Sequence, residues 1–255
     1  DYHVVKAPPV HHAVTFLIEA APRHLHLVVA GRSDPPLPVA RLRARGRLAE
    51  LRAADLRFTT GEAEAFANDV MDLALSRTDV ATLEARTEGW ITGLQLAALS
   101  LRRRPEKDAP SFLAQLTGSN RYILDYLVDE VFAHEPEHVQ AFLIQTSILE
   151  RLCAELCDAV MEGQEIGRLE DWRVGHTDQP SSLPIAQSSH LLDYLDTSNL
   201  FLIPLDDERH WYRYHTLFAD LLRARMAPGR AQALHRRASA WFESEGYIAE
   251  AVDHA

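Results

Sequence analysis

The apolar pattern changes its period twice near the end of the chain. A short helix is predicted around Leu192, and residues 200–203 then form a compact apolar run. A polar turn over 206–209 separates this run from 211–214, which is rich in strand-forming aromatic residues. Another helical pattern follows over 215–226. Helices followed by a β-hairpin are the order of a winged helix.

The first part of the chain, residues 1–58, has the pattern of an α/β unit. Residues 11–20 carry apolar side chains at helical spacing. The run 25–31 is too short for a helix and too apolar for a surface strand, so we predict a buried parallel strand there. A second strand is predicted near 48–53, after a short helix rich in arginine over 41–47. Two strands are few for a parallel sheet, so this unit is predicted to be incomplete.

Residues 59–110 follow a helical pattern. Thr59 and Glu62 have the spacing of a capping box, which marks the start of a helix. Two further helices are expected before the arginines at 102–104, and 106–110 is a plausible linker. We predict a small helical bundle.

Residues 111–228 add more helices before the hairpin. Within them, 163–189 is rich in glycine and proline and poor in apolar anchors, which predicts a flexible insertion. The last stretch, 229–255, predicts two helices broken at Gly246. One such pair cannot bury its own apolar face, so it is predicted to be the first repeat of an array that continues past Ala255.

Composition excludes several classes of protein. The 255 residues are 47% apolar and 25% charged, which is ordinary for a globular chain. No apolar run approaches the roughly 20 residues that cross a bilayer, and no signal peptide is apparent, so a cytoplasmic location is expected. Cys153 and Cys157 are too few for a disulfide framework or a zinc site by spacing, so we interpret them as buried structural thiols and expect no metal.

The charge balance argues against binding to nucleic acid. The formal net charge is −11, from 37 acids and 26 bases. Residues 196–226 hold four arginines against five acids, whereas a surface that recognises DNA should be basic. We therefore interpret the predicted winged helix as an intramolecular packing module with no direct DNA contact and no membrane contact.

Four ordered motifs carry a family resemblance that covers nearly the whole chain apart from 163–189. They are Gly31-Arg32-Ser33-Asp34-Pro35-Pro36-Leu37-Pro38, Thr87-Glu88-Gly89-Trp90 with Gly93-Leu94-Gln95-Leu96-Ala97-Ala98, Ser198-Asn199-Leu200-Phe201-Leu202, and Tyr212-Arg213-Tyr214-His215-Thr216-Leu217-Phe218. Together they resemble the MalT-like large ATP-binding regulators of the LuxR group, which are signal-transduction ATPases with numerous domains (STAND).

The resemblance implies a mainly α fold with a small α/β part. Residues 1–58 would be the rear of a P-loop ATPase core, 59–110 the helical lid, 111–228 the winged helix domain and 229–255 the first TPR-like repeat. No G-x-x-x-x-G-K-[ST] occurs in the sequence, so no cradle for nucleotide phosphates is expected. We therefore expect a regulatory fragment of a transcription activator that lacks the P-loop and the DNA-binding domain. ATP or ADP would bind in the longer parent, and the chain is not expected to be catalytic.

The resemblance also assigns candidate cofactor-binding residues. Asp1 corresponds to the second acid of a Walker B strand, and Arg32 to a sensor of the γ-phosphate. Pairing of Arg32 with Asp34 or with a backbone carbonyl is the alternative. Ile91 stands where relatives often carry a proline against adenine, and core packing is its alternative. His215 corresponds to a histidine that holds the ADP β-phosphate, with helix capping or packing as its alternative.

Two other functions compete with the regulatory one. Ser33 follows the predicted strand roughly where a nucleophile elbow would place it, so an esterase-like hydrolase is possible, but G-x-S-x-P carries a proline in place of the second glycine. A protein-interaction scaffold is the other alternative. Unpaired apolar strand edges would favour self-association or contact with other domains of the parent.

Overall fold

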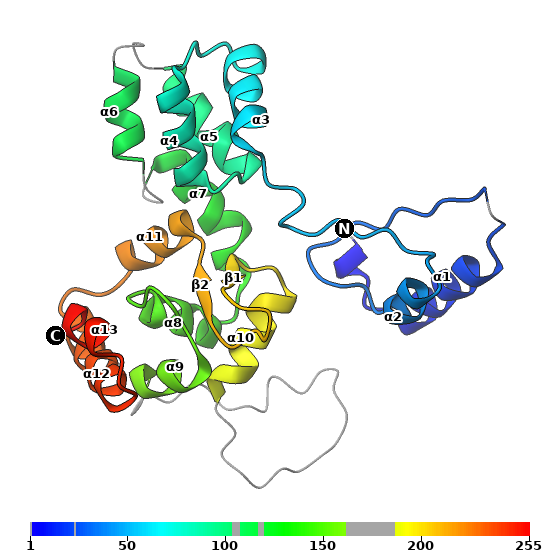
Figure 1. Cartoon of the computed structure of the whole chain (residues 1–255). Helices are drawn as coiled ribbons and strands as arrows, with labels where there is room; N and C mark the ends of the chain where they lie inside the picture. The colour runs from blue at the N-terminus through cyan, green and yellow to red at the C-terminus, as the bar shows by residue number, and fades with distance from the viewer. Residues whose placement is uncertain (1, 23, 104–107, 117–119, 162–186) are drawn as a thin grey trace, which may run out of the picture.

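The computed structural model describes residues 2–22, 24–103, 108–116, 120–161 and 187–255. In this part of the chain the structure is mainly helical, with one two-stranded sheet (Figure 1). The predicted insertion lies outside the described residues except for 187–189, which begin α10. No helix in the described ranges combines the length and the apolar character that crossing a bilayer requires.

The N-terminal part contains η1 (Tyr2–Val4), α1 (Pro8–Ala20) and α2 (Val39–Ala44), and it lies apart from the main body (Figure 1). The predicted helix over 11–20 is confirmed, but both predicted strands are wrong. Residues 24–31 and 48–53 are irregular, and the side chain of Val28 is 89% exposed. A parallel strand needs hydrogen-bonded neighbours, and neither run pairs with a strand in the described residues.

A bundle of short helices follows. Its elements are α3 (Thr60–Ala65), the π-helical turn η2 (Phe66–Val70), α4 (Arg77–Thr87), α5 (Ile91–Leu101) and α6 (Ala109–Ala114). The predicted capping box is confirmed: the Glu62 backbone N–H donates to Thr59 Oγ1 at 3.3 Å, and the Thr59 N–H donates to Glu62 Oε2 at 2.8 Å. α4 packs against α3, α5 and α6. Residues 109 and 110 of the predicted linker belong to α6 instead, and 106 and 107 lie outside the described residues.

The second part of the main body is built around the hairpin. Its elements are α7 (Arg121–Glu130), η4 (Phe132–His134), α8 (Glu137–Thr146), α9 (Ala154–Met161), α10 (Gln187–Thr197), β1 (Leu202–Pro204), β2 (Tyr212–Tyr214) and α11 (Thr216–Ala224). β1 and β2 are antiparallel, with Leu202 opposite Tyr214. Leu152 adds a bridge to Tyr212 on the other edge of β2. The predicted hairpin between helices is confirmed.

The chain ends in a helical pair, α12 (Arg230–Ser244) and α13 (Ile248–Asp253), joined at Gly246 with a φ of 82°. α12 packs against α9. The guanidinium of Arg151 lies 4.3 Å from the ring centroid of Trp211 and 4.7 Å from that of Tyr247, so a cation–π sandwich fixes this pair to the hairpin. The predicted pair of helices is confirmed, and its membership of a repeat array stays a prediction.

One continuous apolar cluster extends from Ala63 in the bundle to Ala251 in α13. In the described residues before Ala63, Leu42 is the one buried apolar side chain, so the N-terminal part contributes little to the core. Cys153 and Cys157 are both buried, as predicted. Burial raises the pKa of the Cys153 thiol to about 12 and raises that of Cys157 as well.

Candidate functional site

The end of α4 meets the start of α11, where the helical bundle contacts the winged helix (Figure 1). We call this contact the joint and define it by Thr87 and Glu88 on one side and Arg213, His215 and Thr216 on the other. Both sides belong to motifs on which the family resemblance depends. The joint is built almost wholly from polar groups that satisfy the ends of the two helices.

Glu88 supplies the central interaction of the joint. Its carboxylate accepts hydrogen bonds from Arg213 Nη1 at 2.9 Å and Nη2 at 2.8 Å. The same carboxylate accepts from the Thr216 backbone N–H at 2.9 Å and from Thr216 Oγ1 at 2.7 Å. Thr216 is the first residue of α11, so the negative charge lies at a helix N-terminus, where the helix dipole favours it. A two-pronged Arg–carboxylate pair combined with a helix cap fixes both distance and orientation.

The electrostatics of Glu88 reflect these contacts. Burial favours the neutral acid, but the hydrogen bonds from Arg213 and Thr216 outweigh it and lower the pKa of Glu88 to about 2. The Glu88 side chain is 11% exposed and that of Arg213 is 33% exposed. The carboxylate is therefore charged at neutral pH and held in a setting that water screens only partly.

His215 is buried at the same place and is fully engaged. Its Nε2 lies 2.9 Å from the Thr87 carbonyl oxygen, and its Nδ1 accepts from the Leu217 backbone N–H at 3.3 Å. These partners require the neutral tautomer that carries its proton on Nε2. Burial also lowers the pKa of His215, which agrees with a neutral ring. His215 thus caps α11 and satisfies the last carbonyl of α4.

Gly89 and Gly93 stand at positions where the structure leaves no room for a side chain. Gly89 has a φ of 70°, and a Cβ on it would lie 2.5 Å from the Phe58 carbonyl oxygen. A Cβ on Gly93 would lie 2.6 Å from the ring of Trp90. The absence of a side chain at Gly93 lets the Trp90 ring pack against α5, and the ring also contacts Phe201 and His215 edge to face, at centroid distances of 5.0 Å and 5.9 Å.

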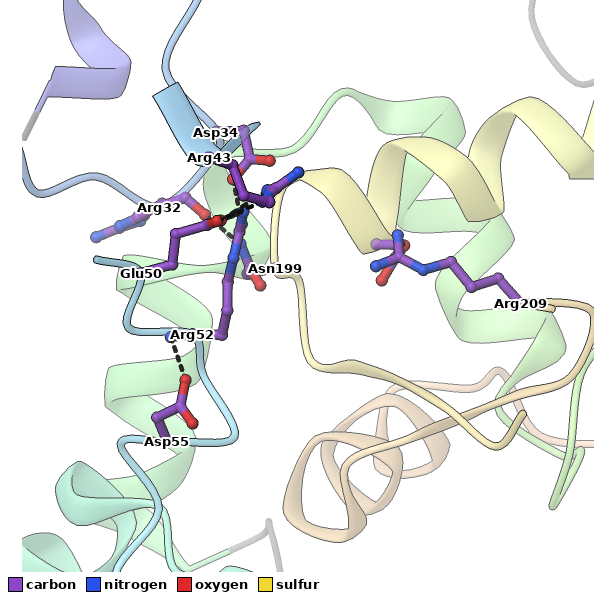
Figure 2. A network of polar contacts seen from close by, with 9 residues as sticks. Arg32, Asp34, Arg43, Glu50, Arg52, Asp55, Asn199 and Arg209 are labelled. Atoms are coloured by element: carbon purple, nitrogen blue, oxygen red, sulfur yellow. Dashed lines mark hydrogen bonds and ion pairs between the residues drawn. The ribbon is translucent and has the colours of Figure 1, made fainter. Parts of the chain in front are cut away.

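Arg32 belongs to a second contact, between the N-terminal part and the winged helix. Its Nη1 donates to the Glu130 carbonyl oxygen at 3.0 Å, and its own carbonyl accepts from Asn199 Nδ2 at 2.6 Å. Figure 2 shows Arg32 and Asn199 side by side. Asn199 has a φ of 50°, and two residues later Phe201 contacts the ring of His215 at 5.6 Å. The turn at 199–201 therefore connects the Arg32 contact to the joint.

Exposed ion pairs surround the Arg32 contact. Arg43 and Arg52 both bind Glu50, and Arg52 also binds Asp34 (Figure 2). Hydrogen bonds from Arg43 and then Arg52 lower the pKa of Glu50 to about 2. Because the arginines are about half exposed, solvent screens these pairs and they add little stability. Asp34 therefore pairs with Arg52, and the side chain of Arg32 contacts Glu130.

The other candidate residues lie in different surroundings. Ile91 begins α5 and packs, half-buried, against the core. Ser33 lies on an irregular segment, and α2 begins only at Val39, so the strand-to-helix elbow required by the hydrolase alternative is absent from residues 24–39. Asp1 lies outside the described residues.

Protein groups engage both residues to which the resemblance assigns phosphate contacts, and their phosphate roles stay predictions. Both ring nitrogens of His215 have protein partners and the residue is 4% exposed. The guanidinium of Arg32 is bound to Glu130. Arg32 and His215 are linked through the turn at 199–201, since Asn199 binds the Arg32 carbonyl and Phe201 contacts the His215 ring.

The central pair of the joint was not singled out in the sequence. Glu88 and Arg213 stand beside the residues that were, within the same two motifs. Their opposite charges are compatible with an ion pair, but 125 residues separate them in the sequence, so the sequence alone does not indicate that they meet. Only the fold places the end of α4 against the start of α11.

A short antiparallel hairpin held among α8, α9, α10 and α11 defines a winged helix domain, joined through Glu88 to a helical bundle. Residues 128–235 match the family model of the MalT winged helix domain. This match bears out the resemblance to MalT that the four motifs indicated.

The whole chain is also similar to parts of larger proteins. The chain is 38% identical over 258 residues to the serine/threonine-protein kinase PknK of Mycobacterium tuberculosis, an alignment that covers 100% of the chain and 21% of that kinase. It is 33% identical over 260 residues to the HTH-type transcriptional regulator MalT of Yersinia enterocolitica, covering 100% of the chain and 26% of that regulator. The MalT of Yersinia pestis is 32% identical over the same length. The chain thus spans about a fifth to a quarter of the length of these relatives.

Proposed function

We propose that this chain is the regulatory middle part of a longer MalT-like transcription regulator of the LuxR group, with the joint as its resting-state lock. The observation that carries the proposal is the Glu88 carboxylate, which binds Arg213 and Thr216 across the boundary between bundle and winged helix. A switch needs two arrangements with different contacts. A polar joint suits this use because its hydrogen bonds can pass to water when it opens, whereas an apolar interface would resist opening.

The lock has the features of a contact that can be released. Arg213 is one-third exposed, so water reaches one face of the pair. The Glu88 side chain caps α11, and His215 contacts the ends of both α4 and α11. Opening would expose the aromatic faces of Trp90 and Phe201, which pack on His215 in the closed state.

ATP or ADP is the proposed cofactor of the longer STAND-type protein, and the chain by itself is proposed to hold neither tightly. The support is the engagement of His215 and Arg32 by protein groups. Calorimetry with each nucleotide tests this part. We expect no binding tighter than about 10 μM, and tighter binding would overturn it.

The proposed partners of the chain are the other domains of the same regulator or a second copy of the chain. Apolar side chains of the N-terminal part support this: Phe16 is 72% exposed, Val28 89% and Leu51 77%. The hairpin turn over 206–209 carries three acids, so direct DNA contact is not proposed. The proposed location is the cytoplasm, and α12 with α13 is the proposed first TPR-like repeat.

The regulatory role is tested by Glu88→Ala in the complete gene that encodes the chain. Glu64→Ala is the matched control, because Glu64 faces Arg77 in an exposed pair at 3.9 Å. We expect Glu88→Ala to change RNA levels of target genes without inducer and Glu64→Ala to leave them unchanged. Unchanged RNA levels in a Glu88→Ala strain with normal protein abundance would overturn the role in transcription.

Similarity to PknK supports a second candidate function, that of a regulatory region attached to a protein kinase. The identity to PknK, 38%, exceeds the 33% to MalT of Yersinia enterocolitica. The same strains distinguish the two candidates. A changed pattern of protein phosphorylation with unchanged primary transcripts would favour the kinase-linked role.

A further inference from the structure

Three potential metal ligands converge where α9 begins beside the hairpin turn. The Sγ of Cys153, a carboxylate oxygen of Glu155 and a ring nitrogen of His210 all lie within 4.8 Å of one another. Cys153 is buried, whereas Glu155 and His210 are exposed. From this geometry we infer a binding site for a divalent metal of the zinc type, held by the Cys153 sulfur, which gives up its proton to solvent as the metal binds, a Glu155 carboxylate oxygen and a His210 ring nitrogen.

The backbone around the site is fixed on both sides. The Leu152 N–H donates to the Tyr212 carbonyl at 2.7 Å, and the Tyr212 N–H donates to the Leu152 carbonyl at 2.8 Å. This bridge holds residue 153 beside the end of the hairpin turn. Asp206 fixes the turn itself, because its carboxylate accepts from the backbone N–H of His210 at 2.8 Å and of Trp211 at 2.9 Å. The three ligands therefore rest on a preformed frame.

The donor set selects the metal. Thiolate with imidazole and one carboxylate favours zinc over magnesium or calcium, which take oxygen ligands. Zinc bonds of about 2.0–2.3 Å place tetrahedral ligand atoms on the order of 3.5 Å apart. The three atoms must approach by about 1 Å, which the exposed side chains of Glu155 and His210 can provide by rotating. The three protein ligands leave a fourth position for water or a ligand.

The hairpin turn that carries His210 is acidic, and Arg151, the cation over the neighbouring Trp211, is paired with Glu250. The turn carries Asp206, Asp207 and Glu208, and Arg209 is paired with Asp196. A bound metal would join the N-terminus of α9 to the turn. It would also stiffen the support of the C-terminal helices, because Trp211, next to His210, packs against Arg151 and Tyr247.

Titration of the whole chain with Zn²⁺ and with Co²⁺ tests the inference. We expect one equivalent to bind with a Kd below about 10 μM, with a cobalt–thiolate absorption band and a raised Tm. His210→Ala should weaken binding at least tenfold, and Cys153→Ser should remove the thiolate band. Absence of binding to the wild type, or binding without that band, overturns the inference.

Two control variants distinguish this site from other metal-binding groups. Cys157→Ala removes the other thiol, and His235→Ala breaks the pair in which His235 Nδ1 lies 2.9 Å from His254 Nδ1. Both should bind the metal as the wild type does. Binding lost in His235→Ala and kept in His210→Ala would place the metal at the histidine pair and contradict the inference. Since His210 is exposed, its replacement should leave the fold intact, which circular dichroism checks.

Discussion

Glu88 and Arg213 form a two-pronged ion pair, with N–O distances of 2.9 Å and 2.8 Å, that joins the C-terminus of α4 to the strand preceding α11. The pair is the only one in the described residues for which the same carboxylate also caps a helix of the opposite unit. This one carboxylate thus adds a polar link to the apolar packing between bundle and winged helix.

Glu88→Ala should lower the free energy of unfolding by about 2–3 kcal/mol, because it leaves Arg213 and the Thr216 N–H without their partner. Urea denaturation measures the change. The exposed Glu64→Ala should shift it by less than about 0.5 kcal/mol. Equal changes in the free energy of unfolding for the two substitutions would show that the contacts of Glu88 stabilise the fold no more than an exposed ion pair does.

Stability should fall with acid through the titration of Glu88. The folded pKa is lowered from 4.5 to about 2, so the unfolded state binds the proton more readily. The carboxylate stabilises the fold fully above pH 4.5, and this contribution, about 3 kcal/mol, is lost as the pH falls from 4.5 towards 2. Unfolding free energies of the wild type and of Glu88→Gln should converge over that range. Parallel curves would contradict the lowered pKa.

Gly89→Ala should destabilise the protein by at least about 2 kcal/mol, since its φ of 70° disfavours a side chain and the new Cβ would meet the Phe58 carbonyl at 2.5 Å. Gly61→Ala is the matched control. A Cβ on Gly61, inside α3, would meet nothing within 4 Å, so helix propensity should make that variant up to about 1 kcal/mol more stable. Thermal unfolding of both variants measures the difference. Equal changes in Tm would contradict the steric role of Gly89.

Arg151→Ala should loosen the C-terminal helices. Arg151 lies between Trp211 and Tyr247 and also pairs with Glu250 in α13. The loss should cost about 1–2 kcal/mol. It should also speed hydrogen exchange of the 248–253 amides. Arg121→Ala, whose side chain is 89% exposed in a loose pair with Asp125, should leave exchange unchanged. Equal protection of the 248–253 amides from exchange in both variants would show that the contacts of Arg151 with Trp211 and Tyr247 do not hold α13 to the hairpin.

The elements that sequence reasoning predicted well are those with local signals. The capping box at Thr59 and the strand-formers around the 206–209 turn depend on residues close in the chain. The runs 25–31 and 48–53 were predicted as strands and are not, because strand formation depends on partners elsewhere. Apolar content alone does not supply a neighbouring strand.

The same distinction applies to the sites. His215 was marked by its motif, and its capping and packing alternative is what the contacts show, whereas its phosphate role stays a prediction. Glu88 and Arg213, and likewise Cys153 and His210, are brought together only by long-range packing. The sequence spacing around Cys153 gave no sign of a ligand in the hairpin turn.

The most direct test of the joint as a lock is a distance measurement between spin labels at Gln95→Cys in α5 and Ala141→Cys in α8. Both positions are exposed, and the native cysteines are buried. The lock predicts one narrow distance distribution, which broadens or gains a second population when Glu88→Ala and Arg213→Ala are introduced together. An unchanged narrow distribution in that variant would contradict the account.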